Sequence, residues 1–145
     1  MRFSFWLTGL LFFLLPGWEN NFEVAKQRAE KEHKLILVNF SGSDWCIPCI
    51  RQHKEVFDSK TFTDYADANL VLLGADFPRL KKNKLPKEQQ KANDELAEKY
   101  NPNGIFPLTL LLDHKGKVIK TWEGDPELKA AAFIDQLKAF SYAGN

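Results

Sequence analysis

Two cysteines constrain this chain more than any other feature of its sequence. Cys46 and Cys49 are the only cysteines in 145 residues, and they lie between an apolar segment, residues 35–40, and a segment with helical spacing, residues 50–57. A helix that starts there has Cys46 at its N-terminus, where unpaired backbone N–H groups and the helix dipole stabilise a thiolate. Cys49, one turn further on, is within reach of the same sulfur. The pair therefore predicts thiol–disulfide exchange, in which a thiolate attacks a disulfide.

Two other uses of a cysteine pair compete with this prediction. A structural disulfide is common in oxidising compartments, but one that closes so short a loop removes little unfolded-chain entropy. Two thiolates at this spacing can also bind Cu(I), so a Cu(I)-binding carrier is an alternative. The chain has no methionine after Met1 and no histidine placed as a further ligand. A closed zinc site needs four ligands. We therefore expect no metal and no cofactor.

The residues around the cysteines resemble those of thioredoxin. Trp45 precedes the motif Cys-Ile-Pro-Cys, after a strand and at the start of a helix. The preceding residues 41–44, with the sequence Ser-Gly-Ser-Asp, resemble the thioredoxin-like proteins of the bacterial cell envelope. The resemblance runs from about Phe22 to the C-terminus, nearly the whole chain after its N-terminal segment.

A second part of the resemblance lies ahead of the apolar run 108–112, in the sequence Gly-Ile-Phe-Pro of residues 104–107. In the family the proline is cis and faces the cysteine pair, and the residue before it pairs through its backbone with a bound peptide. An X-Pro bond adopts the cis form at modest cost. The resemblance therefore assigns Ile105, Phe106 and Pro107, together with Trp45, to substrate binding.

The resemblance also implies a mechanism. Cys46 attacks a substrate disulfide, and Cys49 resolves the mixed disulfide, while Trp45 offers an apolar platform beside the sulfur. Ile47 and Pro48 tune the redox potential. Neither carries a charge or a polar donor, which predicts a thiol that ionises less readily and a lower potential. We therefore expect a protein disulfide reductase rather than an oxidant.

Two positions depart from thioredoxin. Asn39 and Leu72 stand where thioredoxin has a buried aspartate and a lysine that serve the second cysteine as a proton relay. Asn39 accepts no proton, so Cys49 must use water, Asp44 or no dedicated group, and slower resolution follows. These losses leave a non-catalytic interaction module with the thioredoxin fold as a further alternative.

The pattern of elements predicts an α/β protein with a thioredoxin fold: a central mixed β-sheet flanked by helices, after an N-terminal signal segment. Helices are expected from residue 20 or 21 to 34, from the cysteines to residue 57, within 58–67, and from 86 to 100. Strands are expected at 35–40, 70–75, 108–112 and 118–122, the last two joined by a hairpin turn. A last helix is expected to start at Asp125-Pro126, with Leu128, Ala131, Ile134, Leu137 and Phe140 facing the core.

The N-terminus predicts export. Arg2 is followed by an apolar segment, residues 3–15, and then by Pro16-Gly17, the organisation of a secretory signal peptide. We expect residues 1–18 to be a signal peptide, or an uncleaved anchor since the cleavage site is weak, and residues 19–145 to form one thioredoxin-like domain. The protein would lie in the cell envelope, in the periplasm, either soluble after cleavage or tethered.

Charge and compartment together predict the partners. The formal net charge is +1, which gives no sign of a nucleic-acid partner. We expect a monomer that acts on disulfide-containing proteins and receives electrons from a membrane or envelope donor.

Arg51, His53 and Lys54 are expected on a solvated helix face, with tuning of the Cys49 thiol by His53 as the alternative. The Lys-rich residues 79–87 are expected to form a solvated loop, with docking of an acidic partner as the alternative, and the remaining histidines, His33 and His114, are expected to be solvated.

Overall fold

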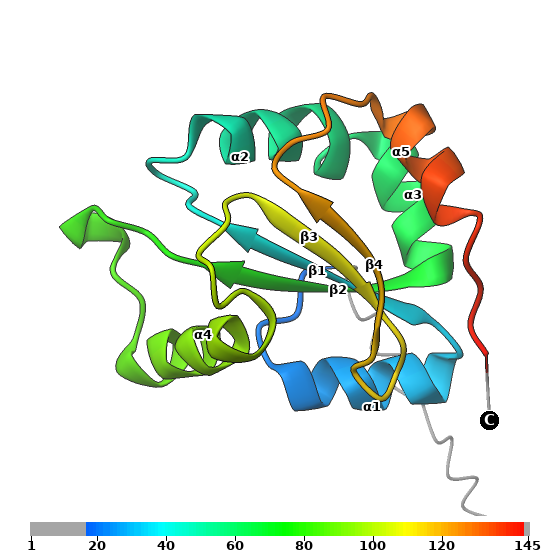
Figure 1. Cartoon of the computed structure of the whole chain (residues 1–145), viewed down its shortest axis with the longest axis horizontal. Coiled ribbons are helices and arrows are strands. Elements are labelled where there is room, and N and C mark those ends of the chain that lie inside the picture. Colours follow the sequence, from blue (N-terminus) through cyan, green and yellow to red (C-terminus); the bar gives the residue numbers. More distant parts are fainter. Residues whose placement is uncertain (1–16, 144–145) are drawn as a thin grey trace, which may run out of the picture.

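The computed structural model describes residues 17–143. Its centre is a four-stranded sheet in the order β2-β1-β3-β4 (Figure 1). The strands are β1 (Leu35–Ser41), β2 (Leu70–Asp76), β3 (Leu108–Leu112) and β4 (Val118–Glu123). β1 pairs in parallel with β2 and antiparallel with β3, and β4 pairs antiparallel with β3 at the edge. The mixed sheet and its terminal hairpin are therefore as the sequence predicted.

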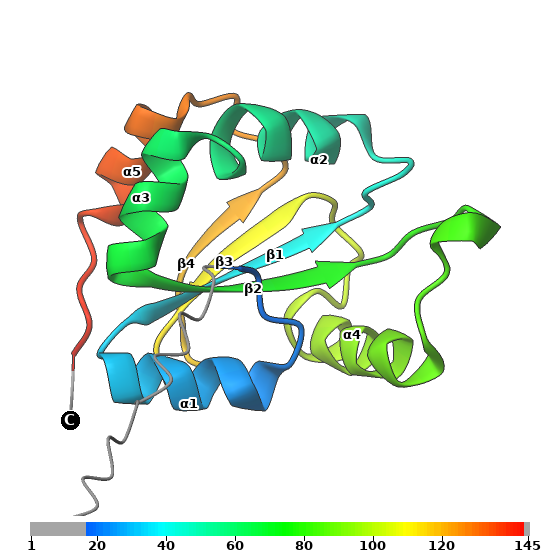
Figure 2. The same ribbon diagram turned by 180° about the vertical axis from the view of Figure 1, so that it is seen from behind.

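Helices cover both faces of the sheet (Figures 1 and 2). One face carries α2 (Ile47–Gln52), the π-helix η1 (His53–Phe57) that continues it, α3 (Lys60–Asn69) and α5 (Ala130–Leu137). The other face carries α1 (Phe22–Glu32) and α4 (Lys87–Tyr100), and the 3₁₀ turn η2 (Lys81–Asn83) lies between β2 and α4. This is the predicted α/β thioredoxin fold, and it confirms helices on both sides of the central strands.

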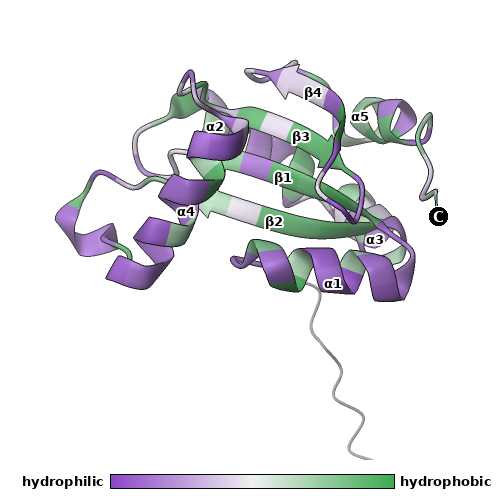
Figure 3. Cartoon of the chain, turned by 60° about the horizontal axis from the view of Figure 1, so that its bottom comes forward, coloured by the Kyte–Doolittle hydropathy of each residue, from purple (hydrophilic) through white to green (hydrophobic). Residues whose placement is uncertain are grey.

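The core explains why β1 is apolar on both faces. All seven of its residues are buried, because helices cover the sheet on either side. Leu35 and Leu37 pack with Phe57, Phe62 and other residues under α3 and α5. Alternate residues of the same strand belong to a second cluster under α1 and α4. Figure 3 shows mostly apolar colour on β1, β2 and β3 and much polar colour on α1 and α4, whereas the edge strand β4 is pale or polar.

Helix starts follow the predicted capping signals in one case and not in another. Asn21 caps α1, its Oδ1 atom accepting from the Val24 N–H at 3.0 Å. The prediction that α5 starts at Asp125-Pro126 is wrong. The Asp125 side chain accepts from the Glu127 N–H in a turn, and Glu127 has a left-handed φ of 55°, which no helix can include. α5 therefore begins at Ala130, and Ala131, predicted to face the core, is exposed.

The segment before α1 belongs to the fold. Glu19 forms an isolated bridge with Leu73, parallel to β2, and Trp18 packs against Phe57 with ring centroids 5.3 Å apart. The predicted signal segment otherwise lies outside the described residues, so it stays a prediction. Within residues 17–143, no helix is both long and apolar enough to cross a membrane.

Candidate active site

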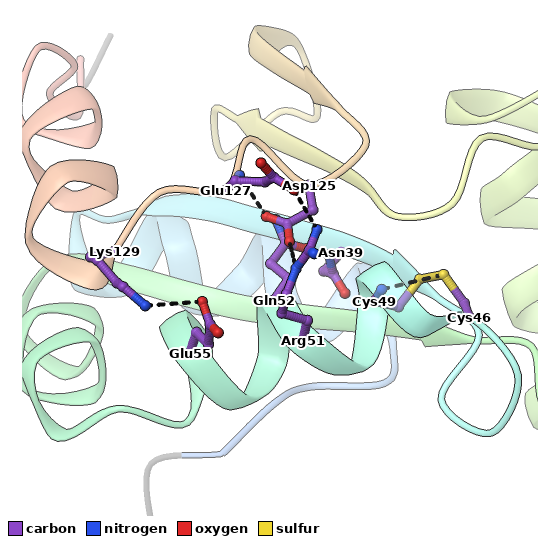
Figure 4. A network of polar contacts seen from close by, with 9 residues as sticks. All are labelled: Asn39, Cys46, Cys49, Arg51, Gln52, Glu55, Asp125, Glu127 and Lys129. Atoms are coloured by element: carbon purple, nitrogen blue, oxygen red, sulfur yellow. Dashed lines mark hydrogen bonds and ion pairs between the residues drawn. A yellow bond between two sulfur atoms is a disulfide. The ribbon is translucent and has the colours of Figure 1, made fainter.

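Cys46 and Cys49 form a disulfide at the start of α2 (Figure 4). Cys46 is the N-cap residue, in an extended conformation, and its Sγ atom accepts from the Cys49 N–H at 3.3 Å. Cys46 is 4 % exposed, whereas Cys49 is fully buried. The predicted position of Cys46 at a helix N-terminus is confirmed. Of the two cysteines, only Cys46 has any exposed surface.

Trp45 lies in a cluster built from distant segments. Its Nε1 atom donates to the carbonyl of Phe77 at 2.8 Å, and its ring meets that of Phe106 edge-on at 5.5 Å. The guanidinium of Arg79 lies 3.6 Å from the centre of the ring, a cation–π distance. The indole also covers Gly42, where a side chain would collide with it. Trp45 therefore joins the residues after β2 to the loop before β3.

The loop before β3 contains the Phe106–Pro107 bond, which is cis. The Asn101 side chain forms hydrogen bonds with both backbone groups of Ile105. Its Nδ2 atom donates to the Ile105 carbonyl, and its Oδ1 atom accepts from the Ile105 N–H, both at 2.8 Å. The backbone N–H and carbonyl of Phe106 have no partner among the described residues. Of these two residues, only Phe106 thus has backbone groups ready to pair with another chain.

Two aspartates organise the loops beside the cysteines. Asp76, at the end of β2, accepts from the backbone and the hydroxyl of Ser43. Asp44 accepts from the backbone N–H groups of Arg79 and Leu80 at 2.9 and 3.0 Å, and from the Asn83 side chain at 3.0 Å. These hydrogen bonds, the Arg79 one first, lower the pKa of Asp44.

Residues 77–86 therefore form an anchored extension rather than an unattached loop, which we call the basic arm. It projects from the end of β2 toward α4 (Figure 1). Its charged residues are exposed, as predicted, but its base is held by Asp44 and by the contact of Arg79 with Trp45. Because both oxygens of Asp44 are engaged there, this carboxylate is poorly suited to take a proton from Cys49.

A buried polar network lies beneath α2, and of its members the sequence indicated a role only for Asn39 and, as an alternative, for His53. Asn39 is 1 % exposed, and its Nδ2 atom donates to Thr109 Oγ1 at 3.1 Å and to Gln52 Oε1 at 3.4 Å. Its Oδ1 atom lies 2.9 Å from Nε2 of His53. Leu72, on the neighbouring strand β2, pairs with Leu37 of β1 and adds no polar group to this network.

The prediction of a solvated His53 is wrong. Its ring is half-buried and packs between Trp18 and Phe57, at centroid distances of 5.5 and 5.1 Å. Burial lowers the pKa of His53 below its ordinary value of 6.5, against the smaller opposing effects of Asp58 and Asp76. The predictions for Arg51 and Lys54 are confirmed, since both are exposed, and Arg51 also forms ion pairs with Asp125 and Glu127 (Figure 4).

Of the remaining residues singled out from the sequence, Ile47 and Pro48 lie at the disulfide, whereas His33 and His114 lie beside Tyr142. Ile47, between the cysteines, is 73 % exposed, and Pro48 follows it in the first turn of α2. His33 is exposed as predicted, but His114 is half-buried against Tyr142. Within residues 17–143, no three His, Cys, Asp or Glu side chains are grouped so as to hold a metal ion.

Comparisons with known proteins agree with this geometry. Residues 17–113 match a family model described as thioredoxin-like. The chain is 34 % identical over 122 residues to the disulfide bond reductase DsbH of Chlamydia pneumoniae, an alignment that covers 84 % of this chain and 70 % of the relative. It is 29 % identical to the thioredoxin-related protein DsbJ of the same organism, over 70 % of this chain and 28 % of that protein. A solved structure of a DsbH oxidoreductase superposes with a TM-score of 0.76 at 32 % identity, over 85 % of this chain and 82 % of the other.

Proposed function

Because this chain belongs to the thioredoxin-like family and is a thiol–disulfide oxidoreductase, we propose that it works as a reductase of protein disulfides outside the cytoplasm. The observation that carries the proposal is the Cys46–Cys49 disulfide at the N-terminus of α2. A bond that closes so short a loop contributes little to stability, so its position at a helix N-terminus, next to the Trp45 that contacts Phe106, favours a redox use. The described relative is named a disulfide bond reductase, which supports the same direction.

The reaction balances as two exchanges. The Cys46 thiolate attacks one sulfur of a substrate disulfide, so a mixed disulfide forms and one substrate thiolate leaves. Cys49 then attacks the Cys46 sulfur, the bond to the substrate breaks, and the substrate leaves with both of its sulfurs reduced. Two electrons have passed to the substrate. The protein is left in the oxidised form, with the bond between Cys46 and Cys49 closed.

The surface around Cys46 suits an extended peptide. The unpaired backbone groups of Phe106 support a role in pairing with the substrate chain, whereas those of Ile105 are occupied by Asn101. Ile47 and Trp45 would supply apolar contacts on either side of the disulfide. We therefore assign substrate binding to Trp45, Phe106 and Pro107. Ile105 would instead hold the loop before β3 in place through its hydrogen bonds with Asn101.

The basic arm supports a preference for acidic substrates. It carries Arg79, Lys81, Lys82 and Lys84, all exposed, and no acidic residue between 77 and 86. Arg79 is the residue of the arm that stacks on Trp45, the residue next to Cys46. A positive surface at this place would attract disulfides flanked by aspartate or glutamate and repel basic ones.

The direction of electron flow rests on the residues between the cysteines. Ile47 and Pro48 offer no charge or donor to a thiolate, and Asn39 contributes a neutral amide beneath the pair. We expect a reduction potential of roughly −270 mV, near that of thioredoxin, when the pair is equilibrated with dithiothreitol buffers. A potential of roughly −120 mV, as in strong oxidants, would reverse the assignment.

The apolar N-terminal segment supports export to the periplasm, with the chain either released or tethered there. A reductase in an oxidising compartment needs electrons from outside, and a membrane or envelope reductase would supply them. We expect it to act as a monomer, because one chain provides both cysteines.

Reduction of insulin disulfides tests the proposal. The wild type should reduce insulin with dithiothreitol as the electron source, and Cys46→Ser should abolish this activity. Reduced Cys49→Ser, mixed with insulin after dithiothreitol has been removed, should instead trap a mixed disulfide through Cys46, visible by mass spectrometry as a thiol-labile adduct. Full activity in the Cys46→Ser variant would exclude the proposed nucleophile, and its retention in both variants would exclude the dithiol cycle.

A further inference from the structure

A cavity of about 510 Å³ lies beside α2 on the side of β2. Cys49 and His53 line it from the helix, Asn39 and Gly74 from the sheet, and Trp18 from the segment before α1. Cys49 itself is fully buried, so its thiol cannot pass a proton directly to bulk solvent. The cavity has room for several water molecules, and both Cys49 and the basic side chain of His53 line it.

The hydrogen bonds of Asn39 fix the tautomer of that side chain. Because its amide nitrogen donates to Thr109 and Gln52, the oxygen of Asn39 is the atom that faces His53, 2.9 Å from Nε2. An amide oxygen only accepts hydrogen bonds, so Nε2 must carry the proton. In the neutral ring Nδ1 is then a proton acceptor, and no described residue occupies it. Trp18 and Phe57 hold the ring in this orientation.

Burial favours the neutral form of the His53 ring over the protonated form. Burial lowers the pKa of His53, and the nearby carboxylates of Asp58 and Asp76 offset this only in part. Glu19 and Lys54 also line the cavity and bring opposite charges to it. A neutral imidazole can take a proton, whereas a protonated one cannot.

We propose that His53 accepts the proton of the Cys49 thiol, through water in the cavity, when Cys49 resolves the mixed disulfide. The inference rests on the proposed function. The Cys49 S–H bond breaks, its proton goes to Nδ1, and the sulfur keeps the electron pair with which it attacks Cys46. The bond from Cys46 to the substrate breaks, and the substrate thiolate leaves with that electron pair. The imidazolium later returns its proton to solvent or, in the reverse direction, to Cys49.

Two nearby carboxylates, those of Asp76 and Asp58, are weaker candidates than His53 for accepting the proton of Cys49. Asp76 accepts from both the backbone and the hydroxyl of Ser43 and also from the Phe77 N–H, so its oxygens are already engaged. Asp58 lines the cavity, but its side chain is exposed, and a carboxylate is in general a weaker base than a neutral imidazole. Asp58→Asn therefore serves as the rival variant in the test.

A two-step colour assay separates attack from resolution. Reduced protein is mixed in a stopped-flow instrument with dithiobis-nitrobenzoate, which releases one coloured thiolate when Cys46 attacks and a second when Cys49 resolves. His53→Gln should leave the first phase unchanged and slow the second by about 100-fold at neutral pH. His33→Gln, at an exposed histidine outside the cavity, should change neither phase. A second phase within twofold of wild type in His53→Gln, or an equal loss in Asp58→Asn, would overturn the inference.

Chemical rescue distinguishes a base from a space-filling ring. In His53→Ala, added imidazole should restore the second phase, with a dependence on pH that follows its neutral form, whereas pyrrole, of the same shape but without a basic nitrogen, should not. Equal rescue by pyrrole would show that the ring only fills space. If the wild type fails to reduce insulin, the proposed function fails; if it reduces insulin and His53→Gln resolves normally, only the present inference fails.

Discussion

The indole of Trp45 lies so close to Gly42 that a Cβ atom added there would be 2.2 Å from its Cε2 atom. Gly42→Ala must therefore displace the ring, and with it the hydrogen bond to Phe77 and the contact with Phe106. We expect a loss of about 1–3 kcal/mol in the free energy of unfolding, the usual cost of overpacking. Insulin reduction should fall with it, because the ring borders Cys46.

A double-mutant cycle identifies the cause of that loss. If the collision with Trp45 is responsible, Gly42→Ala should cost much less stability in a Trp45→Ala background than in the wild type. Urea unfolding of the four proteins measures this coupling. Equal costs in both backgrounds would place the effect in the backbone of the loop rather than in the ring.

Asp44 is expected to hold the basic arm in place. Asp44→Ala removes the acceptor of the Arg79 and Leu80 N–H groups, so both amides should lose protection from hydrogen exchange. Asp94→Ala, which alters only an exposed side-chain contact with Gln90 on α4, should leave the arm protected. Unchanged exchange in Asp44→Ala would mean that other contacts anchor the arm.

The anchoring should also depend on pH in a definite direction. Hydrogen bonds lower the pKa of Asp44 below its ordinary value of 3.8, so the contribution of this carboxylate to folding is complete above that value. It is lost only as the pH falls through the lowered pKa. Protection of the Arg79 amide, measured relative to Asp44→Ala, should therefore persist in mildly acidic solution.

Arg79 is expected to select substrates by charge. Arg79→Gln should lower kcat/KM for a peptide disulfide with acidic flanks by about tenfold at low ionic strength, since the positive charge that stacks on Trp45 is lost. A neutral peptide of the same length should be affected far less, and added salt should remove the difference. Lys31→Gln, in the last turn of α1 on the face of the sheet opposite α2, is the matched control. Equal losses for the acidic and the neutral peptide would assign Arg79 to packing against Trp45 alone.

His53 should make stability depend on pH. Because its pKa is lower in the folded protein than its ordinary value of 6.5, the unfolded chain takes up a proton first as the pH falls. The free energy of unfolding should therefore decrease below pH 6.5 and level off once the folded protein is protonated too. His53→Gln should remove this part of the pH dependence. A stability profile identical in the two proteins would contradict the burial of a neutral imidazole.

Those parts of the fold that depend on local patterns could be predicted from the sequence. β1 was recognisable because its apolar run has the length of a buried strand, and the cysteine motif fixed the start of α2. His53 was grouped with its charged neighbours, although Cys49, Gln52, His53 and Val56 follow one another at the spacing of a single helix face. That spacing was the available signal for the buried network.

Other features depend on contacts that no local pattern reveals. Asp44 and Arg79 are 35 residues apart, so the anchoring of the basic arm appears only once β1 and β2 lie side by side. The late start of α5 has a similar origin. Asp125 is a good capping residue, but Arg51 binds its side chain and a turn uses its other oxygen.

The lining of the cavity includes Cys49 and His53 but none of Cys46, Trp45 and Phe106. Exposed Lys54 and Asp58 are also part of it, so it communicates with water away from those three residues. If His53 accepts the proton as proposed, a substrate docked over Trp45 and Phe106 would exchange electrons at Cys46 while the proton leaves through this opening. Electrons and protons would then take separate routes, and proton balance could be restored while the substrate is still in place.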